Sequence, residues 1–184
     1  MARTNHHEQA PTPSGGPGSQ GSGVRTAVVL TGAQVWREVD KASFAVLSHV
    51  TPSGEPRSSG IVYKAVRGHL YVAVAPTSWK ARQISTGDRI AMTVLVRRGG
   101  MLSLVLPIPP ATISFRGTVV VHAADAPEVR PLLAELKALL PSERAESACL
   151  IEIAPEGEFL TYGVGVALMT MRDPQAARAR VSVS

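Results

Sequence analysis

The sequence predicts a mainly β (α+β) fold, an antiparallel barrel of six to seven strands with about three peripheral helices. Three observations lead to this prediction. Apolar segments of strand length follow one another as hairpins, with turn residues between them. Residues 111–122 alternate between two faces, as a half-buried strand does. No G-x-G-x-x-G motif follows a predicted strand, since the one match, at 16–21, lies in the Gly- and Pro-rich N-terminal stretch. No Walker loop occurs either, so the sequence does not indicate a parallel nucleotide-binding sheet.

A first helix is expected over residues 31–41. Thr31 is a suitable N-cap residue, and Val35, Trp36 and Val39 then fall on one helical face. The amphipathic pattern indicates that this helix covers the barrel with that face.

Turn residues separate the remaining elements. Residues 51–55 and the Arg67-Gly68 pair have the composition of tight turns. A second helix is expected over 77–85. A third is expected to begin at Asp125, because Asp125 and Glu128 together resemble a capping box. Strands are expected over the following ranges: 44–50, 56–66, 69–75, 89–96, 111–122, 148–154 and 158–166.

Composition divides the chain into three parts. Residues 1–24 are rich in Gly, Pro, Ser and Gln and are expected to be a disordered tail. Residues 25–170 form the single folded domain, and 171–184 are a weakly patterned C-terminal segment. The apolar loop 101–110, which is rich in Leu and Pro, is expected to pack on a partner subunit or to cover a ligand.

The charge balance is basic, with a formal net charge of +5 and a pI near 9.9. The cations are scattered and aromatic residues make up only 4%, so we expect no nucleic-acid partner. The chain has no apolar run long enough for a membrane span, and Cys149 is its one cysteine, expected in the core. We therefore expect a cytoplasmic protein with no membrane partner.

The start of the second expected helix has the composition of an anion site. Thr77 and Ser78 supply hydroxyls, and Lys80 follows as a cation. The first amides of a helix lack partners, and the helix dipole favours negative charge there. The sequence therefore predicts a phosphate site, which on a small β-protein without an evident catalytic triad indicates a bound cofactor.

The order of motifs resembles the pyridoxamine 5′-phosphate oxidase-like flavin-binding split-barrel family. The resemblance covers roughly residues 34–159 and depends on three motifs and their spacing. They are Pro-Ser-Gly-Glu-Pro-Arg at 52–57, Thr-Ser-Trp-Lys-Ala-Arg-Gln-Ile at 77–84 and Pro-Pro-Ala-Thr-Ile-Ser-Phe-Arg-Gly at 109–117. It implies a homodimer of split barrels with two flavin sites at the subunit interface, each built from both chains.

The resemblance also implies which residues bind the cofactor. Residues 57–62 would lie along the isoalloxazine ring, and Val72 and Ala73 would contribute backbone contacts. Ser78 and Lys80 would hold the terminal phosphate. No catalytic side chain and no metal ligand is implied. The full cofactor-binding set is Arg57, Ser58, Ser59, Gly60, Ile61, Val62, Val72, Ala73, Ser78, Lys80, Arg82 and Gln83.

Two departures from the oxidase pattern argue against vitamin B6 synthesis. Trp79 stands where the pattern has a basic residue, and Thr112 where it has a glutamine. Related proteins use either FMN or a 5-deazaflavin coenzyme of the F-420 type, and both stay open here. The longer anionic tail of the deazaflavin would need extra cations, for which the candidates are Arg82, Arg97, Arg98 and Arg116.

The leading hypothesis is a flavin- or deazaflavin-dependent oxidoreductase that transfers hydride to or from a small apolar or conjugated substrate. Tyr63 and Tyr162 are expected to pack rather than to transfer protons. The alternative is a non-catalytic protein of the same fold that binds or sequesters flavin or haem. For haem the available axial ligands are His49, His69 and His122, each expected at the surface at a strand edge or turn.

Overall fold

The structure is a computed structural model, and it describes residues 29–98, 109–123, 125–127, 129–137 and 148–184. The predicted tail 1–24 and residues 101–108 of the apolar loop lie outside these residues, as does Glu128 of the expected capping box. No helix in the described part of the chain is long and apolar enough to cross a membrane.

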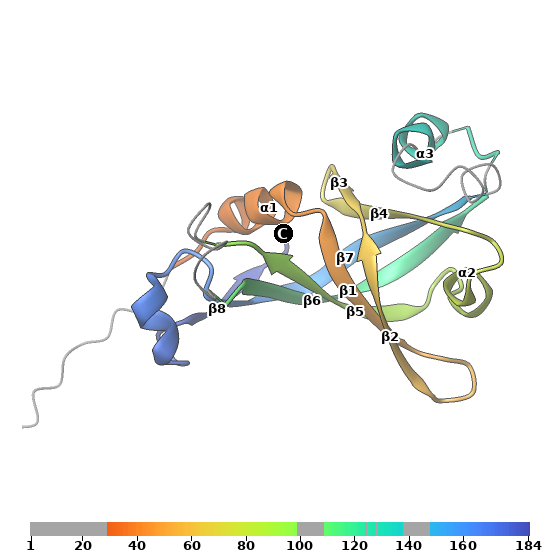
Figure 1. The fold of residues 1–184 in the computed structure, drawn as a ribbon. Coiled ribbons are helices and arrows are strands. Elements are labelled where there is room, and N and C mark those ends of the chain that lie inside the picture. Colours follow the sequence, from red (N-terminus) through yellow and green to blue (C-terminus); the bar gives the residue numbers. More distant parts are fainter. Residues whose placement is uncertain (1–28, 99–108, 124, 128, 138–147) are drawn as a thin grey trace, which may run out of the picture.

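The fold is a curled antiparallel sheet that forms a half-barrel, as Figure 1 shows. Seven strands follow one another in the order β2-β1-β5-β6-β7-β4-β3, and β8 pairs with β7. Every described pairing is antiparallel. The mainly β, split-barrel prediction is confirmed. The strands are β1 (Phe44–Val50), β2 (Pro56–Val62), β3 (Lys64–Val66), β4 (His69–Val74), β5 (Arg89–Val96), β6 (Ala111–His122), β7 (Cys149–Tyr162) and β8 (Arg178–Ser182).

Three α-helices lie at the margins of the sheet, as predicted: α1 (Gly32–Lys41), α2 (Trp79–Gln83) and α3 (Arg130–Lys137). The expected start of the third helix at Asp125 is wrong, because Asp125 lies in a turn and the helix begins at Arg130, next to Pro131, which suits the first turn of a helix. A 3₁₀ helix, η2, spans Leu168–Arg172. Thr31 caps α1 in a capping box with Gln34, since each side chain bonds the other residue's backbone N–H. In Figure 1, α1 lies at one end of the sheet, and α2 and α3 lie at the other.

The expected strand 56–66 is divided in the structure. Tyr63 separates β2 from β3, and these strands pair with different neighbours, β1 and β4. The Tyr63 side chain is buried, its hydroxyl donates to the Val39 carbonyl at 2.6 Å, and its N–H donates to Ser43 O. Alternation continues through this residue, so the sequence pattern does not reveal the break.

The two strands expected over 148–154 and 158–166 form one strand, β7, of 14 residues. Gly157 lies inside it with a φ of 72°, near a shift in the β6–β7 register between Ser114 and Arg116. The C-terminal segment 171–184 contains β8, which extends the sheet beside β7.

The main core fills the half-barrel and is closed at one end by α1. Phe159 lies at its centre, with edge-to-face contacts to Phe115 at 5.4 Å and to Trp36 at 5.2 Å between ring centroids. Val35 and Val39 of α1 are buried against this core, as the helical pattern predicted. A second apolar cluster lies under α3, where Leu133 and Leu136 pack near Tyr71 and Ala73 of β4.

Candidate functional site

A cavity of about 410 Å³ lies between β2 and β4, at the end of the sheet that carries α2. Apolar residues of the two strands line one part of it, and polar residues at the start of α2 line another. Leu136 of α3 completes the wall. The lining residues are Gly60, Ile61, Val62, Val72, Ala73, Val74, Ala75, Thr77, Ser78, Lys80 and Leu136.

The β4 side of the cavity exposes an unpaired strand edge. Residues 72–74 pair with β7 on one side, but β3 reaches only as far as Tyr71 on the other. Their remaining backbone groups therefore face away from the ladder and can bond a ligand.

A close contact with Phe44 of β1 leaves no room for a side chain at Gly60 on β2. A Cβ atom at this position would lie 2.8 Å from the Phe44 ring, closer than real Cβ atoms approach. The aromatic ring therefore lies directly over the glycine at the rim of the cavity.

Ser78 begins α2 as its N-cap. Its hydroxyl oxygen accepts from Ala81 N–H at 3.2 Å, and its backbone N–H donates to Ala75 O at 2.9 Å. Buried Ile84 follows α2 and anchors it to the core. The hydroxyl hydrogen of Ser78 is left to donate into the cavity, where an oxyanion could accept it.

Lys80 brings a positive charge to the same end of the cavity. Its Nζ donates to Ser59 Oγ at 3.3 Å and lies 5.2 Å from the centroid of the Trp79 ring. No carboxylate in the described residues pairs with it, and burial lowers the pKa of Lys80 below the usual lysine value. An anion bound here would compensate a charge that the described residues leave uncompensated.

Most of the predicted cofactor-binding residues meet at this cavity. Seven of them line it, and Ser59 bonds Lys80 beside it. The seven are Gly60, Ile61, Val62, Val72, Ala73, Ser78 and Lys80.

The other four predicted residues do not line the cavity. Arg57 is exposed and pairs with Glu55 at 2.8 Å, and the Ser58 hydroxyl bonds that of Ser48 at 2.7 Å. Arg82 is exposed and Gln83 half-buried, one turn further along α2. Their roles toward a cofactor stay predictions.

Sequence reasoning missed Val74, Ala75 and Leu136 as lining residues, and it named Thr77 in the anion site but not in the cofactor-binding set. Thr77 belongs to the motif that predicted the site, and Val74 and Ala75 continue the strand before it. No sequence pattern indicated that Leu136 lines the cavity, since only the packing of α3 brings it there.

His49 lies beneath α2 and is buried, which corrects the expectation that it is a surface histidine. Its side chain is 5% exposed, and its ring stacks on Trp79 with centroids 5.2 Å apart and planes 14° apart. Neither ring nitrogen has a hydrogen-bond partner. Alternation along β1 points His49 inward, together with Ala45 and Leu47, so burial follows from strand register.

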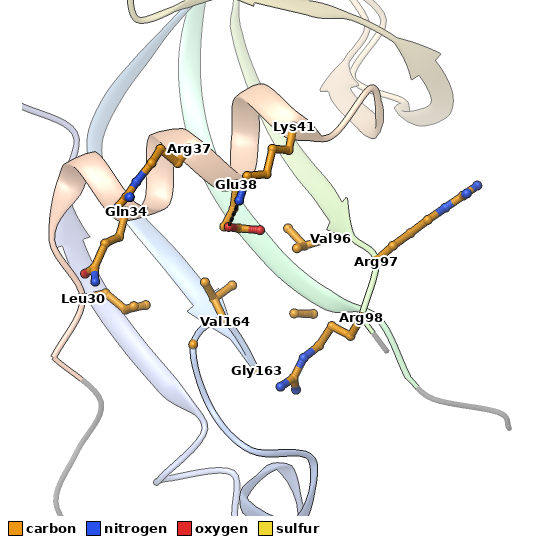
Figure 2. A pocket seen from close by; sticks show the side chains of 12 residues that line it. Leu30, Gln34, Arg37, Glu38, Lys41, Val96, Arg97, Arg98, Gly163 and Val164 are labelled. Atoms are coloured by element: carbon orange, nitrogen blue, oxygen red, sulfur yellow. Dashed lines mark hydrogen bonds and ion pairs between the residues drawn. The ribbon is translucent and has the colours of Figure 1, made fainter. Parts of the chain in front are cut away.

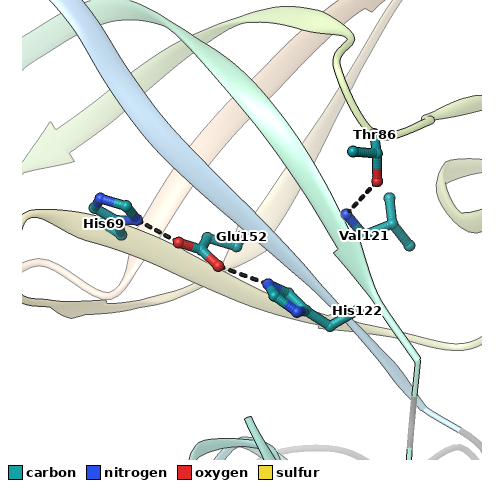
Figure 3. Close-up of polar contacts among 5 residues, drawn as sticks. All are labelled: His69, Thr86, Val121, His122 and Glu152. Carbon is teal, nitrogen blue, oxygen red and sulfur yellow. Dashed lines mark hydrogen bonds and ion pairs between the residues drawn. The ribbon is translucent and has the colours of Figure 1, made fainter. Parts of the chain in front are cut away.

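His69 and His122 share one carboxylate on the outer face of β4, β7 and β6, as Figure 3 shows. His69 Nδ1 bonds one oxygen of Glu152, and His122 Nε2 bonds the other at 2.6 Å. Thr86, also drawn in Figure 3, accepts a bond from Val121 N–H at 2.9 Å. His122 is mostly buried, which again differs from a surface position, whereas the His69 side chain is 43% exposed.

The environment of Glu152 changes its acidity. Burial raises the pKa of Glu152, but the hydrogen bonds and positive charges of His69 and His122 outweigh burial, and the net pKa lies below the usual value. The folded state therefore favours ionised Glu152.

Three other candidate groups are engaged in packing. Tyr63 is buried with its hydroxyl on Val39 O, and burial raises its pKa well above the usual tyrosine range. Tyr162 donates to Met171 O at 2.7 Å. Burial likewise raises the pKa of Cys149, which keeps its thiol protonated. The expectation that Tyr63 and Tyr162 are packing residues agrees with these contacts.

Comparison with solved structures shows how widely this fold is shared. The haem-binding protein from Mycobacterium smegmatis aligns with 85% of this chain at 12% identity and a TM-score of 0.59, and the chain spans 60% of that protein's length. HutZ, the haem storage protein from Vibrio cholerae, aligns over 72% of this chain and 95% of its own at 11% identity and a TM-score of 0.56. The FAD-binding protein from Mycobacterium smegmatis aligns over 70% of this chain and 91% of its own at 12% identity and a TM-score of 0.51.

No protein-family model matches the sequence, and no curated protein matches it. At identities of 11–12% the structural likeness establishes the fold alone. The chain shares a split-barrel fold with these proteins, as its motif order predicted.

The Glu152 cluster predicts a pH-dependent loss of stability. Folding lowers the pKa of Glu152 from its ordinary value of 4.5, so its stabilisation is present above that value and is lost as the pH falls through the folded pKa. At pH 7, Glu152→Gln should reduce the free energy of unfolding by about 1–2 kcal/mol, measured by urea denaturation. The difference from wild type should shrink as the pH falls below 4.5.

Glu158→Gln is the matched control on the same strand, because Glu158 pairs with Arg180 at an exposed position. It should cost less than about 0.5 kcal/mol at any pH. A Glu152→Gln effect that is independent of pH would contradict the assignment.

Proposed function

We propose that this chain binds a flavin-type cofactor between β2 and β4 and acts as an oxidoreductase. One observation carries the proposal: a single cavity joins Lys80, a cation that no described carboxylate pairs with, to an apolar strip with a free strand edge. A flavin nucleotide has matching parts, since it joins an anionic phosphate to a flat, largely apolar ring with a polar edge.

The residues of the cavity fit the two parts of such a cofactor. Ser78 and Lys80 would hold the phosphate with charge-assisted hydrogen bonds. Ile61 and Val72 offer apolar surface to the ring, and the backbone of residues 72–74 offers hydrogen bonds to its polar edge.

When bound, the flavin supplies hydride transfer, and the protein positions the ring and shields it from water. The Tyr63 and Tyr162 hydroxyls already donate to backbone carbonyls, so neither is available to a substrate in this arrangement. The cavity wall is mostly apolar, which suits a small apolar or conjugated substrate.

The placement of the arginines favours FMN over the deazaflavin. Of the four candidates for binding a longer anionic tail, Arg82 alone lies on α2 beside the cavity. Arg97 and Arg98 line a different cavity next to α1, and Arg116 lies against the Gly157 turn. A single chain thus presents one extra cation near the cavity rather than four.

We propose that a second copy of the chain covers the rim of this cavity. Val62 and Phe44 are opposite each other on β2 and β1, and they are 50% and 45% exposed. Exposed apolar side chains at the rim of a cofactor cavity are stabilised when another subunit covers them. This arrangement supports a homodimer in which both chains enclose the cofactor.

Haem binding without turnover is the second candidate function, and His69 is the observation that favours it. Glu152 holds its Nδ1, which leaves Nε2 of a half-exposed imidazole as a possible axial ligand. Two structures of the same fold are named as haem-binding and haem storage proteins. Haem titration should then shift and sharpen the Soret band of free haem, and His69→Ala should abolish that change. A Soret band that stays like that of free haem in the wild-type protein would end this candidate.

The oxidoreductase proposal is tested by reoxidation kinetics. The protein is loaded with FMN, reduced anaerobically and mixed with a quinone in a stopped-flow instrument. We expect the rate of reoxidation to saturate with quinone concentration, because a substrate site fills. A linear dependence equal to that of free reduced FMN would contradict a catalytic role and leave a cofactor-binding protein.

The phosphate assignment is tested with two ligands. Lys80→Ala should weaken FMN binding by about 10- to 100-fold, because a charge-assisted bond to the phosphate is lost. Riboflavin, which lacks the phosphate, should bind both proteins equally in the same calorimetric titration. Lys41→Ala at the distant end of α1 is the control. Equal FMN affinity of wild type and Lys80→Ala would refute the assignment.

The dimer is tested by light scattering coupled to gel filtration. Val62→Asp should shift the protein from a dimer to a monomer, since a carboxylate would be buried in the apolar interface. Val29→Asp, at an 86% exposed position before α1, should leave the dimer intact. A wild-type protein that is monomeric at all concentrations would exclude this partner.

A further inference from the structure

A second cavity, of about 440 Å³, lies beside α1 at the opposite end of the sheet. Figure 2 shows α1 along one side of this cavity, and the ends of β5 and β7 along the other. It shares no lining residue with the cavity between β2 and β4. Leu30, Val96 and Val164 give it an apolar surface.

Arg98 supplies a fixed positive charge to this cavity. Figure 2 shows the Arg98 side chain directed toward Gly163 on the other side of the cavity, whereas the Arg97 side chain points away from the cavity. The Arg98 guanidinium donates to the Val166 carbonyl and lies 2.7 Å from the Met171 sulfur. Both partners are neutral, and no carboxylate among the described residues pairs with Arg98. Its orientation is therefore set while its charge stays uncompensated.

The α1 side does not cancel this charge. Glu38 is the one carboxylate that lines the cavity, and it already pairs with Lys41 at 3.0 Å. Arg37 adds another cation on the same helix without an acidic partner in the described part of the chain. The lining thus combines a net positive charge with an apolar surface.

We propose that this cavity is a second ligand site, separate from the cofactor cavity, for a small organic anion with an apolar body. The oxyanion group would bind the free N–H donors of Arg98. The apolar body would lie against Val96 and Val164. The chemistry of this lining fits aromatic or branched carboxylates, and the proposal does not depend on the oxidoreductase function.

Anilinonaphthalene sulfonate is a suitable probe, because it joins an oxyanion to an apolar ring system. Its fluorescence should report saturable 1:1 binding to the full-length protein. N-phenyl-1-naphthylamine, the uncharged analogue, should bind at least about tenfold more weakly. Saturation with FMN should leave the binding of the probe unchanged, because the two cavities share no residue.

Two variants locate the probe. Arg98→Gln should weaken its binding about tenfold, and Lys41→Glu, at a 70% exposed position, should also weaken it by adding negative charge beside Glu38. Lys41→Glu keeps the test valid if Arg98→Gln disturbs the bond to Val166. Arg89→Gln removes the same charge at an exposed position on β5 outside the cavity and should have no effect.

Four results would overturn the proposal. They are no saturable binding, equally tight binding of the uncharged analogue, displacement of the probe by FMN, and unchanged affinity in both cavity variants.

Discussion

The half-barrel is held in shape by one covalent constraint, the segment 56–66. Its two parts, β2 and β3, occupy the opposite ends of the strand order, yet only Tyr63 separates them in the chain. The sheet must therefore curl until its two edges meet at this residue. Tyr63 is fixed there by its buried ring and by its hydroxyl bond to Val39 O in α1.

The candidate cofactor cavity is a consequence of this constraint. Tyr63 links β2 to β3, and β3 pairs with β4 only as far as Tyr71, so β2 and β4 lie next to each other without pairing. The seam between them leaves a strand edge and an apolar surface open, and α2 closes one end with Ser78 and Lys80. Lys80, which has no carboxylate partner among the described residues, thus lies at the place where the sheet is not closed by strand pairing.

Local signals in the sequence predicted much of this arrangement. Turn residues and alternation identified the hairpins, and the Thr-Ser-Trp-Lys motif identified the polar end of the cavity. The division of residues 56–66 had no local signal, because strand pairing over long distances decides it. The cluster of His69, His122 and Glu152 was missed for the same reason, since Glu152 is 83 and 30 residues away from its two partners. The resemblance places Arg57 along the flavin ring; its exposed side chain pairs with Glu55 here, and its role toward a cofactor stays a prediction.

The central claim is the location of the cofactor, and amide chemical-shift mapping during an FMN titration tests it most directly. We predict that the largest shifts cluster at residues 60–62, 72–75 and 77–81, which border the seam. Shifts centred on Arg98 and α1, or around His69, would contradict this account, as would a spectrum that FMN leaves unchanged.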